Sequence, residues 1–313
     1  MFRPRRLLAA VTAALALGSA AACGTPAPEQ PAAPEAGARV ITHAKGQTTI
    51  TGTPQRVVVL DTGELDAVLA LGIKPVGTVL PDANKTLQPY LAEKAGDIEI
   101  VGTIGSPNLE KITALQPDLI LSSKVRDDEN YEALSKIAPT VFAETVGKTW
   151  KDNFLLDADA LGKKAEAQQI LDAYQQRAAE IGKQTGDPGA QRISMLRFIP
   201  GDIRLYNQGS FIGTILADAG FSRPANQEAD TTHTKISREQ ISQADGDQLF
   251  YAAYGDSARQ QMNDVVGSVQ WTTLGAVRAG KAVEVSDDTW FLGLGPIAAN
   301  LVLDDLQKHL AQR

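Results

Sequence analysis

The stretch RVVVLD, residues 56–61, is a continuous apolar run between an arginine and an aspartate. Apolar runs without alternation are typical of strands buried on both faces of a parallel sheet. The next segment, Gly63 to Leu71, carries apolar residues at helical spacing and is followed by Gly72, so it predicts a helix with a glycine stop. A buried strand that leads directly into a helix is the first unit of an α/β fold.

The same alternation extends to both sides of this unit. Residues 40–50, with the turn Lys45-Gly46, predict a short hairpin before it. The strands predicted after it are 76–79, 98–101, 118–121 and 140–142, and the helices are 108–115 and 131–137. Strands that alternate with helices predict a mostly parallel sheet covered on both faces.

A long helical stretch follows this first half. Residues 152–184 contain no proline, and their apolar residues recur close to every 3.6 positions. The sequence GDPG at 186–189 stops the pattern. One continuous helix over this range would measure roughly 45–50 Å, which is long enough to join two lobes as a rigid spine.

After this helix the strand and helix pattern resumes. The predicted strands are 192–199, 203–206, 248–251 and 282–285, and the helices are 211–219, 237–244 and 297–309. We therefore predict an α/β fold with two Rossmann-like lobes, whose mostly parallel sheets are joined by one long helical spine. The predicted boundaries are 39–150 for the N-terminal lobe, 151–185 for the linking helix and 186–313 for the C-terminal lobe.

The first 22 residues have the organisation of a bacterial signal peptide. Three arginines precede an apolar run at 7–17, and small residues fill 18–22. Cys23 stands where lipoproteins are cut and acylated, so residues 1–22 predict a lipoprotein signal peptide. The alternative is an ordinary secretory signal with an incidental cysteine, since Ala20 occupies a position where leucine is commonest. Residues 23–38 are rich in proline and alanine and predict an extended tether.

Composition excludes several classes of function. Cys23 is the only cysteine, so no intramolecular disulfide can form. The net charge of −7 argues against a nucleic-acid partner. His43, His233 and His309 are scattered along the chain, which argues against a directly bound metal. The sequence has no Gly-x-Ser-x-Gly elbow and no nucleophile paired with a base, so we expect no enzyme and no cofactor.

The two halves of the chain contain a similar short sequence motif. NLEKI at 108–112 and SREQI at 237–241 each predict a short helix with a glutamate near its start, Glu110 and Glu239, and each precedes a predicted strand. Glutamate in a first helical turn is also favoured by the helix dipole. A functional reading gives each lobe one acidic side chain at an equivalent place.

Several stretches together resemble the substrate-binding proteins of ABC importers for iron–siderophores and cobalamin. They are RVVVLD at 56–61, LALGIKPVG at 69–77, PNLE at 107–110, LQPDLI at 115–120, SFIG at 210–213, LADAG at 216–220 and WFLGLGP at 290–296. The resemblance covers nearly all of residues 40–310, and it implies two α/β lobes bridged by one long helix.

The resemblance also implies partners. Family members dock on arginines of a membrane permease through one acidic residue per lobe, and the matching positions here are Glu110 and Glu239. It implies a monomer on the outer face of the cytoplasmic membrane, anchored in the lipid by acylated Cys23, that delivers a small ferric chelate.

The resemblance and the strand ends suggest where the ligand binds. The predicted ligand-binding residues are Trp290, Arg126, Arg197, Arg204, Tyr254, Thr62, Ile104 and Leu292. Each arginine could instead be a surface residue, and His233 and Trp271 are expected outside the site. Many family members have arginine at the position of Ile104, so its absence favours a neutral or cationic hydroxamate chelate similar to ferrioxamine. Cobalamin and haem remain the alternative ligands.

Overall fold

The fold was obtained as a computed structural model that describes residues 37–81 and 86–310. The predicted signal peptide, Cys23 and nearly all of the predicted tether therefore lie outside the described residues. The chain begins, within the described part, with the antiparallel hairpin β1 (Ala38–His43) and β2 (Gly46–Thr51), as predicted. A hydrogen bond of 2.9 Å from the Ala44 amide to the Phe142 carbonyl joins this hairpin to the first sheet.

The first sheet has the strand order β6-β5-β4-β3-β7-β8, and only β6 runs antiparallel to its neighbour. Its strands are β3 (Val57–Val59), β4 (Gly77–Leu80), β5 (Glu99–Thr103), β6 (Ser106–Pro107), β7 (Leu119–Ser123) and β8 (Thr140–Ala143). The helices of this lobe are α1 (Thr62–Ala70), α2 (Pro89–Ala95), α3 (Leu109–Ala114), α4 (Lys124–Asp127) and α5 (Tyr131–Ser135). The RVVVLD stretch thus forms the buried strand β3, which lies between β4 and β7.

The second sheet has the order β11-β10-β9-β12-β13. Its strands are β9 (Ile193–Ile199), β10 (Asp202–Tyr206), β11 (His233–Ile236), β12 (Gln248–Ala253) and β13 (Ala282–Glu284). Strands β9, β12 and β13 run parallel, whereas β10 and β11 form an antiparallel edge. The helices of this lobe are α8 (Phe211–Asp218), α9 (Gly255–Val266), α10 (Val269–Thr272), α11 (Gly275–Arg278), α12 (Asp287–Trp290) and α13 (Pro296–Leu310).

The prediction of a single linking helix is wrong in one respect. The segment forms two helices, α6 (Trp150–Ala160) and α7 (Lys164–Gln184). Gly162 takes a left-handed conformation with φ of 74°. Its amide donates to the Asp159 carbonyl, and the Lys163 amide donates to the Ala158 carbonyl, which is the hydrogen-bond pattern of a glycine C-cap. The apolar periodicity continues across this break, so the sequence pattern does not reveal the end of α6.

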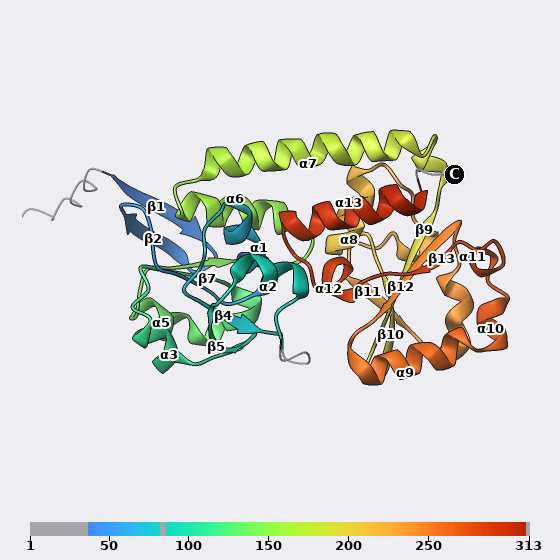
Figure 1. The fold of residues 1–313 in the computed structure, drawn as a ribbon, viewed down its shortest axis with the longest axis horizontal. Coiled ribbons are helices and arrows are strands. Elements are labelled where there is room, and N and C mark those ends of the chain that lie inside the picture. Colours follow the sequence, from blue (N-terminus) through green and yellow to red (C-terminus); the bar gives the residue numbers. More distant parts are fainter. Residues whose placement is uncertain (1–36, 82–85, 311–313) are drawn as a thin grey trace, which may run out of the picture. The chain divides into compact units, whose positions relative to one another are not determined.

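Helices α7 and α13 run side by side along one edge of the molecule's described body (Figure 1). Helix α13 also packs against α1 of the first lobe. Asp66 of α1 accepts hydrogen bonds from the Ile297 and Ala298 amides at 2.8 and 3.0 Å, and so caps the start of α13. One continuous core therefore contains residues of both sheets together with α1, α6, α7, α8 and α13. Each lobe has a further core of its own on the other face of its sheet.

The predicted helix at 237–244 is a 3₁₀ helix, Arg238–Ala244. Ser237 begins it with a capping box, in which the Gln240 side chain accepts a hydrogen bond from the Ser237 amide at 2.9 Å. In the part of the chain that the structure describes, no helix is both long and apolar enough to cross a membrane.

Candidate functional site

A cavity of about 400 Å³ opens where the two sheets face each other. Residues of both lobes line it, and most of them stand at or just beyond the ends of strands, where ligands of parallel sheets bind. The lining residues are Asp61, Thr62, Pro81, Ile104, Arg126, Val146, Gly147, Arg197, Ile199, Arg204, Tyr206, Phe211, Thr232, His233, Tyr254, Phe291, Leu292 and Leu294. Three guanidinium groups therefore line the same cavity as a patch of aromatic and aliphatic side chains.

The first-lobe side of the cavity is organised by Arg126 at the start of α4. Its Nε donates to Oδ2 of Asp61 at 2.8 Å, and Asp61 is buried at the carboxyl end of β3. The other oxygen of Asp61 accepts from the Thr62 amide at 2.7 Å and caps α1. The carboxylate of Asp61 raises the pKa of Arg126 and holds this cation at the cavity wall. Its two Nη groups have no hydrogen-bond partner within the described ranges, so a ligand could bind them.

Arg197 of β9 organises the second-lobe side. Its Nε and Nη2 donate to the two oxygens of Asp287 at 2.6 Å each, and its Nη1 donates to the Tyr206 hydroxyl at 2.8 Å. Its guanidinium carbon lies 5.0 Å from the ring centre of Tyr254 and 5.4 Å from that of Phe291, distances at which cations attract aromatic rings. Burial alone would lower the pKa of Arg197, but Tyr206 and Asp287 reverse this and raise it.

Arg204 of β10 lies directly across the strand pair from Arg197. Its Nε donates to Asp202 at 3.0 Å, and Asp202 also binds Nζ of Lys235 at 2.9 Å. Although burial acts in the opposite direction, these two cations hold the pKa of Asp202 below its usual range. The Nη groups of Arg204 have no partner among the residues that the structure describes, so a ligand could bind them.

His233 also lines the cavity, which the sequence-based expectation did not include. It is paired with Tyr206 across β10 and β11, and the two ring centres are 5.9 Å apart. Burial and the nearby Arg204 lower the pKa of His233, which favours the neutral ring. Its Nδ1 is buried and has no hydrogen-bond partner within the described ranges.

The cavity brings together seven of the eight predicted ligand-binding residues: Thr62, Ile104, Arg126, Arg197, Arg204, Tyr254 and Leu292. The placement of Trp290 is a correction. Its side chain is fully buried, its Nε1 donates to Asp305 at 2.8 Å, and its ring packs on Phe250. Because α12 turns the ring into the core, the next residue, Phe291, lines the cavity instead.

The sequence reasoning missed further members of the wall, of which Asp61, Tyr206 and Phe291 make the contacts described above. Asp61 ends the RVVVLD stretch and Phe291 lies in WFLGLGP, and both stretches were already noted, so a signal was present. Asp287 was missed as the partner of Arg197 because 90 residues separate the two in the chain. No local pattern connects positions so far apart.

The two predicted docking residues lie outside the cavity. Glu110 is exposed in the first turn of α3, and Glu239 is exposed in the first turn of the 3₁₀ helix Arg238–Ala244. The Ser237 side chain lowers the pKa of Glu239. Both carboxylates are therefore available to a partner's cations, and their role stays a prediction.

Comparison with known proteins gives consistent matches over most of the chain. The family model described as periplasmic binding protein matches residues 57–289. A probable siderophore-binding lipoprotein of Bacillus subtilis, YfiY, is 37% identical over 283 residues, which are 87% of each chain. The Fe(3+)-citrate-binding protein YfmC of the same organism is 32% identical over 80% of this chain and 79% of that protein. The crystal structure of Staphylococcus aureus SirA complexed with staphyloferrin B superposes with a TM-score of 0.80 at 34% identity, covering 87% of this chain and 98% of that one.

Proposed function

The chain belongs to the periplasmic binding protein family, and on this premise we propose that it captures a ferric siderophore for an ABC importer. The observation that carries the proposal is the cavity of about 400 Å³, which combines three arginines with an aromatic and aliphatic wall drawn from both lobes. Ferric siderophores have oxygen-rich surfaces joined by apolar struts. Guanidinium groups donate to such oxygens, and aromatic rings pack on such struts.

We further propose that the chelate is anionic and of the carboxylate type. Arg126 and Arg204 each use Nε for an aspartate, and their Nη groups have no partner among the residues that the structure describes. A carboxylate is the group that a planar guanidinium binds best. The relatives named for ferric citrate and for staphyloferrin B support this class. The sequence-based prediction of a neutral or cationic hydroxamate rested on Ile104 and on the match of Trp290 to hydroxamate binders, and it stays the competing prediction.

A ligand panel separates these classes. Calorimetric titration of the soluble chain that starts after Cys23 should include ferric citrate, ferric staphyloferrin B, ferrioxamine, ferric enterobactin, haem and cobalamin. We expect an anionic carboxylate chelate to bind more tightly than ferrioxamine. Tighter binding of ferrioxamine would restore the hydroxamate prediction, and binding of cobalamin or haem alone would overturn the siderophore proposal.

The arginine contacts give a matched test of the same proposal. Arg126→Ala should weaken binding of the anionic chelate by about 10- to 100-fold, because a charge-assisted hydrogen bond contributes about 1.5–3 kcal/mol. Arg192→Ala is the control, since Arg192 also pairs with an aspartate, Asp247, but does not line the cavity. Equal affinities of both variants would show that Arg126 makes no contact with the ligand.

Haem is the alternative ligand that one observation at the cavity favours. His233 lines the cavity, and its Nδ1 is buried without a hydrogen-bond partner among the described residues. A neutral imidazole is a common metal ligand. Titration with haem followed by absorption spectroscopy tests this. A spectral change that His233→Ala abolishes would support haem, whereas an unchanged haem spectrum would leave His233 as a lining residue.

The place of action is also a proposal. Acylation of Cys23 would hold the lobes at the outer face of the cytoplasmic membrane, and Glu110 and Glu239 would dock them as a monomer on the permease. A tether raises the effective concentration of receptor at its channel. Mass spectrometry of the membrane-extracted protein should find an acylated N-terminal Cys23, and Cys23→Ser should release the protein from the membrane.

A further inference from the structure

Three cations stand in one row across the second sheet, next to the ligand cavity. The strand register places Arg197 of β9 opposite Arg204 of β10, and it places Arg204 opposite Lys235 of β11. Like charges directly opposite each other on neighbouring strands repel. Arg197 and Arg204 both line the cavity, so this face of the sheet gathers positive charge at the ligand site.

His233 lies beside this row and on the same face of the sheet. It comes two residues before Lys235 in β11, and side chains two positions apart in a strand point to the same face. Its register partner is Tyr206, which comes two residues after Arg204 in β10. The four residues therefore form a patch in which a pair of cations adjoins a pair of rings. Of the four, Arg204, Tyr206 and His233 line the cavity.

The carboxylates that pair with the row do not balance its charge. Asp202 binds both Arg204 and Lys235, at 3.0 and 2.9 Å. Asp287 binds Arg197 through both of its oxygens, at 2.6 Å each. Within the described residues, three cations of the row therefore share two carboxylates, which leaves an excess of positive charge beside the histidine.

The other carboxylates around His233 already have partners. Asp230, three positions before it in the chain, binds Nζ of Lys148 at 2.8 Å. On the first-lobe side of the cavity, Asp61 binds Nε of Arg126, also at 2.8 Å. Neither aspartate is therefore free to serve as the counter-charge of an imidazolium at the cavity wall.

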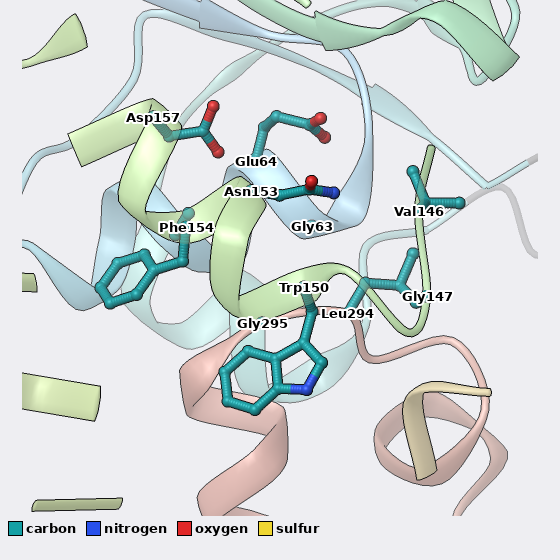
Figure 2. A pocket seen from close by; sticks show the side chains of 11 residues that line it. Gly63, Glu64, Val146, Gly147, Trp150, Asn153, Phe154, Asp157, Leu294 and Gly295 are labelled. Atoms are coloured by element: carbon teal, nitrogen blue, oxygen red, sulfur yellow. The ribbon is translucent and has the colours of Figure 1, made fainter. Parts of the chain in front are cut away.

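Two further buried acids lie near the ligand cavity but not in its wall. Glu64 and Asp157 line a second, much smaller cavity of about 10 Å³. Figure 2 shows this small cavity with Val146, Gly147 and Leu294, which line the ligand cavity as well. The two acids are not among the residues that line the ligand cavity, so they offer no carboxylate to its contents.

These surroundings disfavour a charged imidazolium in the ligand-free protein. Burial and then Arg204 lower the pKa of His233. Lys235 and Arg197 act in the same direction, and Asp202 acts against them. The Nδ1 atom of His233 is buried with no hydrogen-bond partner in the described part of the chain, so no acceptor there stabilises a proton on this atom.

We propose that His233 takes up a proton when an anionic chelate enters the cavity, so that ligand and proton strengthen each other's binding. This inference rests on the proposed function and adds the regulation of the same site. A carboxylate of the chelate bound beside Arg204 would bring the missing counter-charge, and an opposite charge within about 4–6 Å favours the charged form of a titratable group. A neutral chelate brings no such charge, so it should bind without this proton.

The sign of the pH dependence follows from linkage. In the free protein the pKa of His233 is lowered from 6.5, and a bound anion should raise it. Between the free and the bound pKa, the complex holds a proton that the free protein lacks, so affinity falls as the pH rises. Below the free pKa both states hold the proton, and above the bound pKa neither does, so this effect ends at each limit.

Calorimetry with the variant His233→Gln tests the proposal. Titration with ferric citrate in two buffers of different ionisation heat counts the protons that are taken up on binding. The unsubstituted protein should take up more protons than the variant near pH 6.5. Its affinity relative to that of the variant should be about three- to tenfold higher at pH 6 than at pH 8, since one pH unit of pKa change gives at most about tenfold. Comparison of two proteins with one ligand cancels the titration of the chelate itself.

Ferrioxamine is the matched control ligand. Wherever it binds, the unsubstituted protein and His233→Gln should take up the same number of protons. A difference between the two proteins that is as large with ferrioxamine as with ferric citrate would show that the charge of the ligand is not the cause, and the proposal would be wrong.

A second measurement reads the histidine directly in the unsubstituted protein. Gallium(III) citrate replaces the paramagnetic iron complex, and nuclear magnetic resonance follows the histidine ring protons through a pH titration. The pKa of His233 should rise by about one pH unit when the gallium chelate binds. His43 is the internal control, because it lies in the β1–β2 hairpin and does not line the cavity, so its pKa should stay the same.

The outcomes separate this inference from the proposed function. If ferric citrate binds with equal proton uptake in both proteins and the pKa of His233 does not rise, the inference is wrong and the proposed capture of a chelate stands. If neither ferric citrate nor ferric staphyloferrin B binds at pH 6 or at pH 8, the carboxylate-chelate proposal fails, and this inference fails with it.

Discussion

At the scale of single residues, the cavity wall is held together by arginines paired with aspartates. Thr62, Ile104, Arg126 and Tyr254 could be placed at the cavity because parallel strands end together at one edge of a sheet, so residues that follow these strands lie near one another. Arg197 and Arg204 lie within β9 and β10, so this rule does not predict them. The pairing of the cavity residues could not be predicted. Arg126 and Asp61 are 65 positions apart in the chain, and only the folded sheet brings them to 2.8 Å. The direction in which a ring points, as for Trp290, depends on packing in the same way.

Arg197 gives the sharpest prediction at this scale. Arg197→Leu should destabilise the ligand-free protein by about 3–5 kcal/mol, because it leaves the buried carboxylate of Asp287 without its partner. Urea denaturation measures the loss. The double variant Arg197→Leu with Asp287→Leu should recover much of it, since the second change removes the orphaned charge.

The control for this prediction is Arg192→Leu. Arg192 forms a similar pair with Asp247, but its side chain is 60% exposed, and exposed pairs contribute at most about 1 kcal/mol. A loss of the same size in Arg192→Leu and Arg197→Leu would mean that burial of the pair is not the cause.

At the scale of elements, most strands and helices follow from sequence pattern, and two of the exceptions have an identifiable cause. The break between α6 and α7 was missed because the glycine cap at Gly162 interrupts the backbone without interrupting the apolar spacing. Helix α9 was missed because it begins at a glycine with φ of 76°, after Tyr254, whose side chain caps nothing. Each of these helix ends depends on the positive φ angle of one glycine, Gly162 or Gly255.

Gly182 of α7 tests how closely these elements pack. Glycine to alanine within a helix normally stabilises by about 0.5–1 kcal/mol, but here the added methyl group would lie 1.9 Å from the Ala219 carbonyl oxygen. Gly182→Ala should therefore destabilise, by about 2 kcal/mol or more, as measured by urea denaturation. Glu180→Ala, an exposed change on the same helix, should be nearly neutral. Stabilisation by Gly182→Ala would show that α7 and the end of α8 do not approach so closely.

At the scale of the whole described molecule, the two lobes share one continuous core rather than meeting through a single helix. Residues of β3 and β7 in the first lobe and of β9 and β12 in the second belong to the same cluster. Sequence periodicity predicted the joining helix but not the role of α13, which returns from the second lobe to pack on α1. That contact depends on Asp66 capping α13 across 231 positions of the chain.

The docking prediction belongs at this scale because it concerns both lobes at once. The double variant Glu110→Ala with Glu239→Ala should keep its affinity for the chelate, since neither residue lines the cavity. Uptake by cells should fall by about tenfold or more, because each lost charge pair weakens docking roughly fivefold at about 1 kcal/mol. Isotope uptake assays with parallel titrations measure both quantities.

The matched control replaces two other exposed glutamates, Glu132 and Glu180, which should change neither binding nor uptake. If the Glu110 and Glu239 variant loses chelate affinity, these residues act on the ligand site. If its uptake equals that of the control, docking does not use them.

The burial of the tryptophans determines how the protein should fluoresce. All three indoles, Trp150, Trp271 and Trp290, are at least 96% buried, so the protein's emission should lie at the short wavelengths of indoles shielded from water. None of the three lines the ligand cavity. A light-absorbing ferric chelate should therefore lower the intensity of this emission by energy transfer without shifting its wavelength. A shift of the emission wavelength on binding would report a change in the core itself.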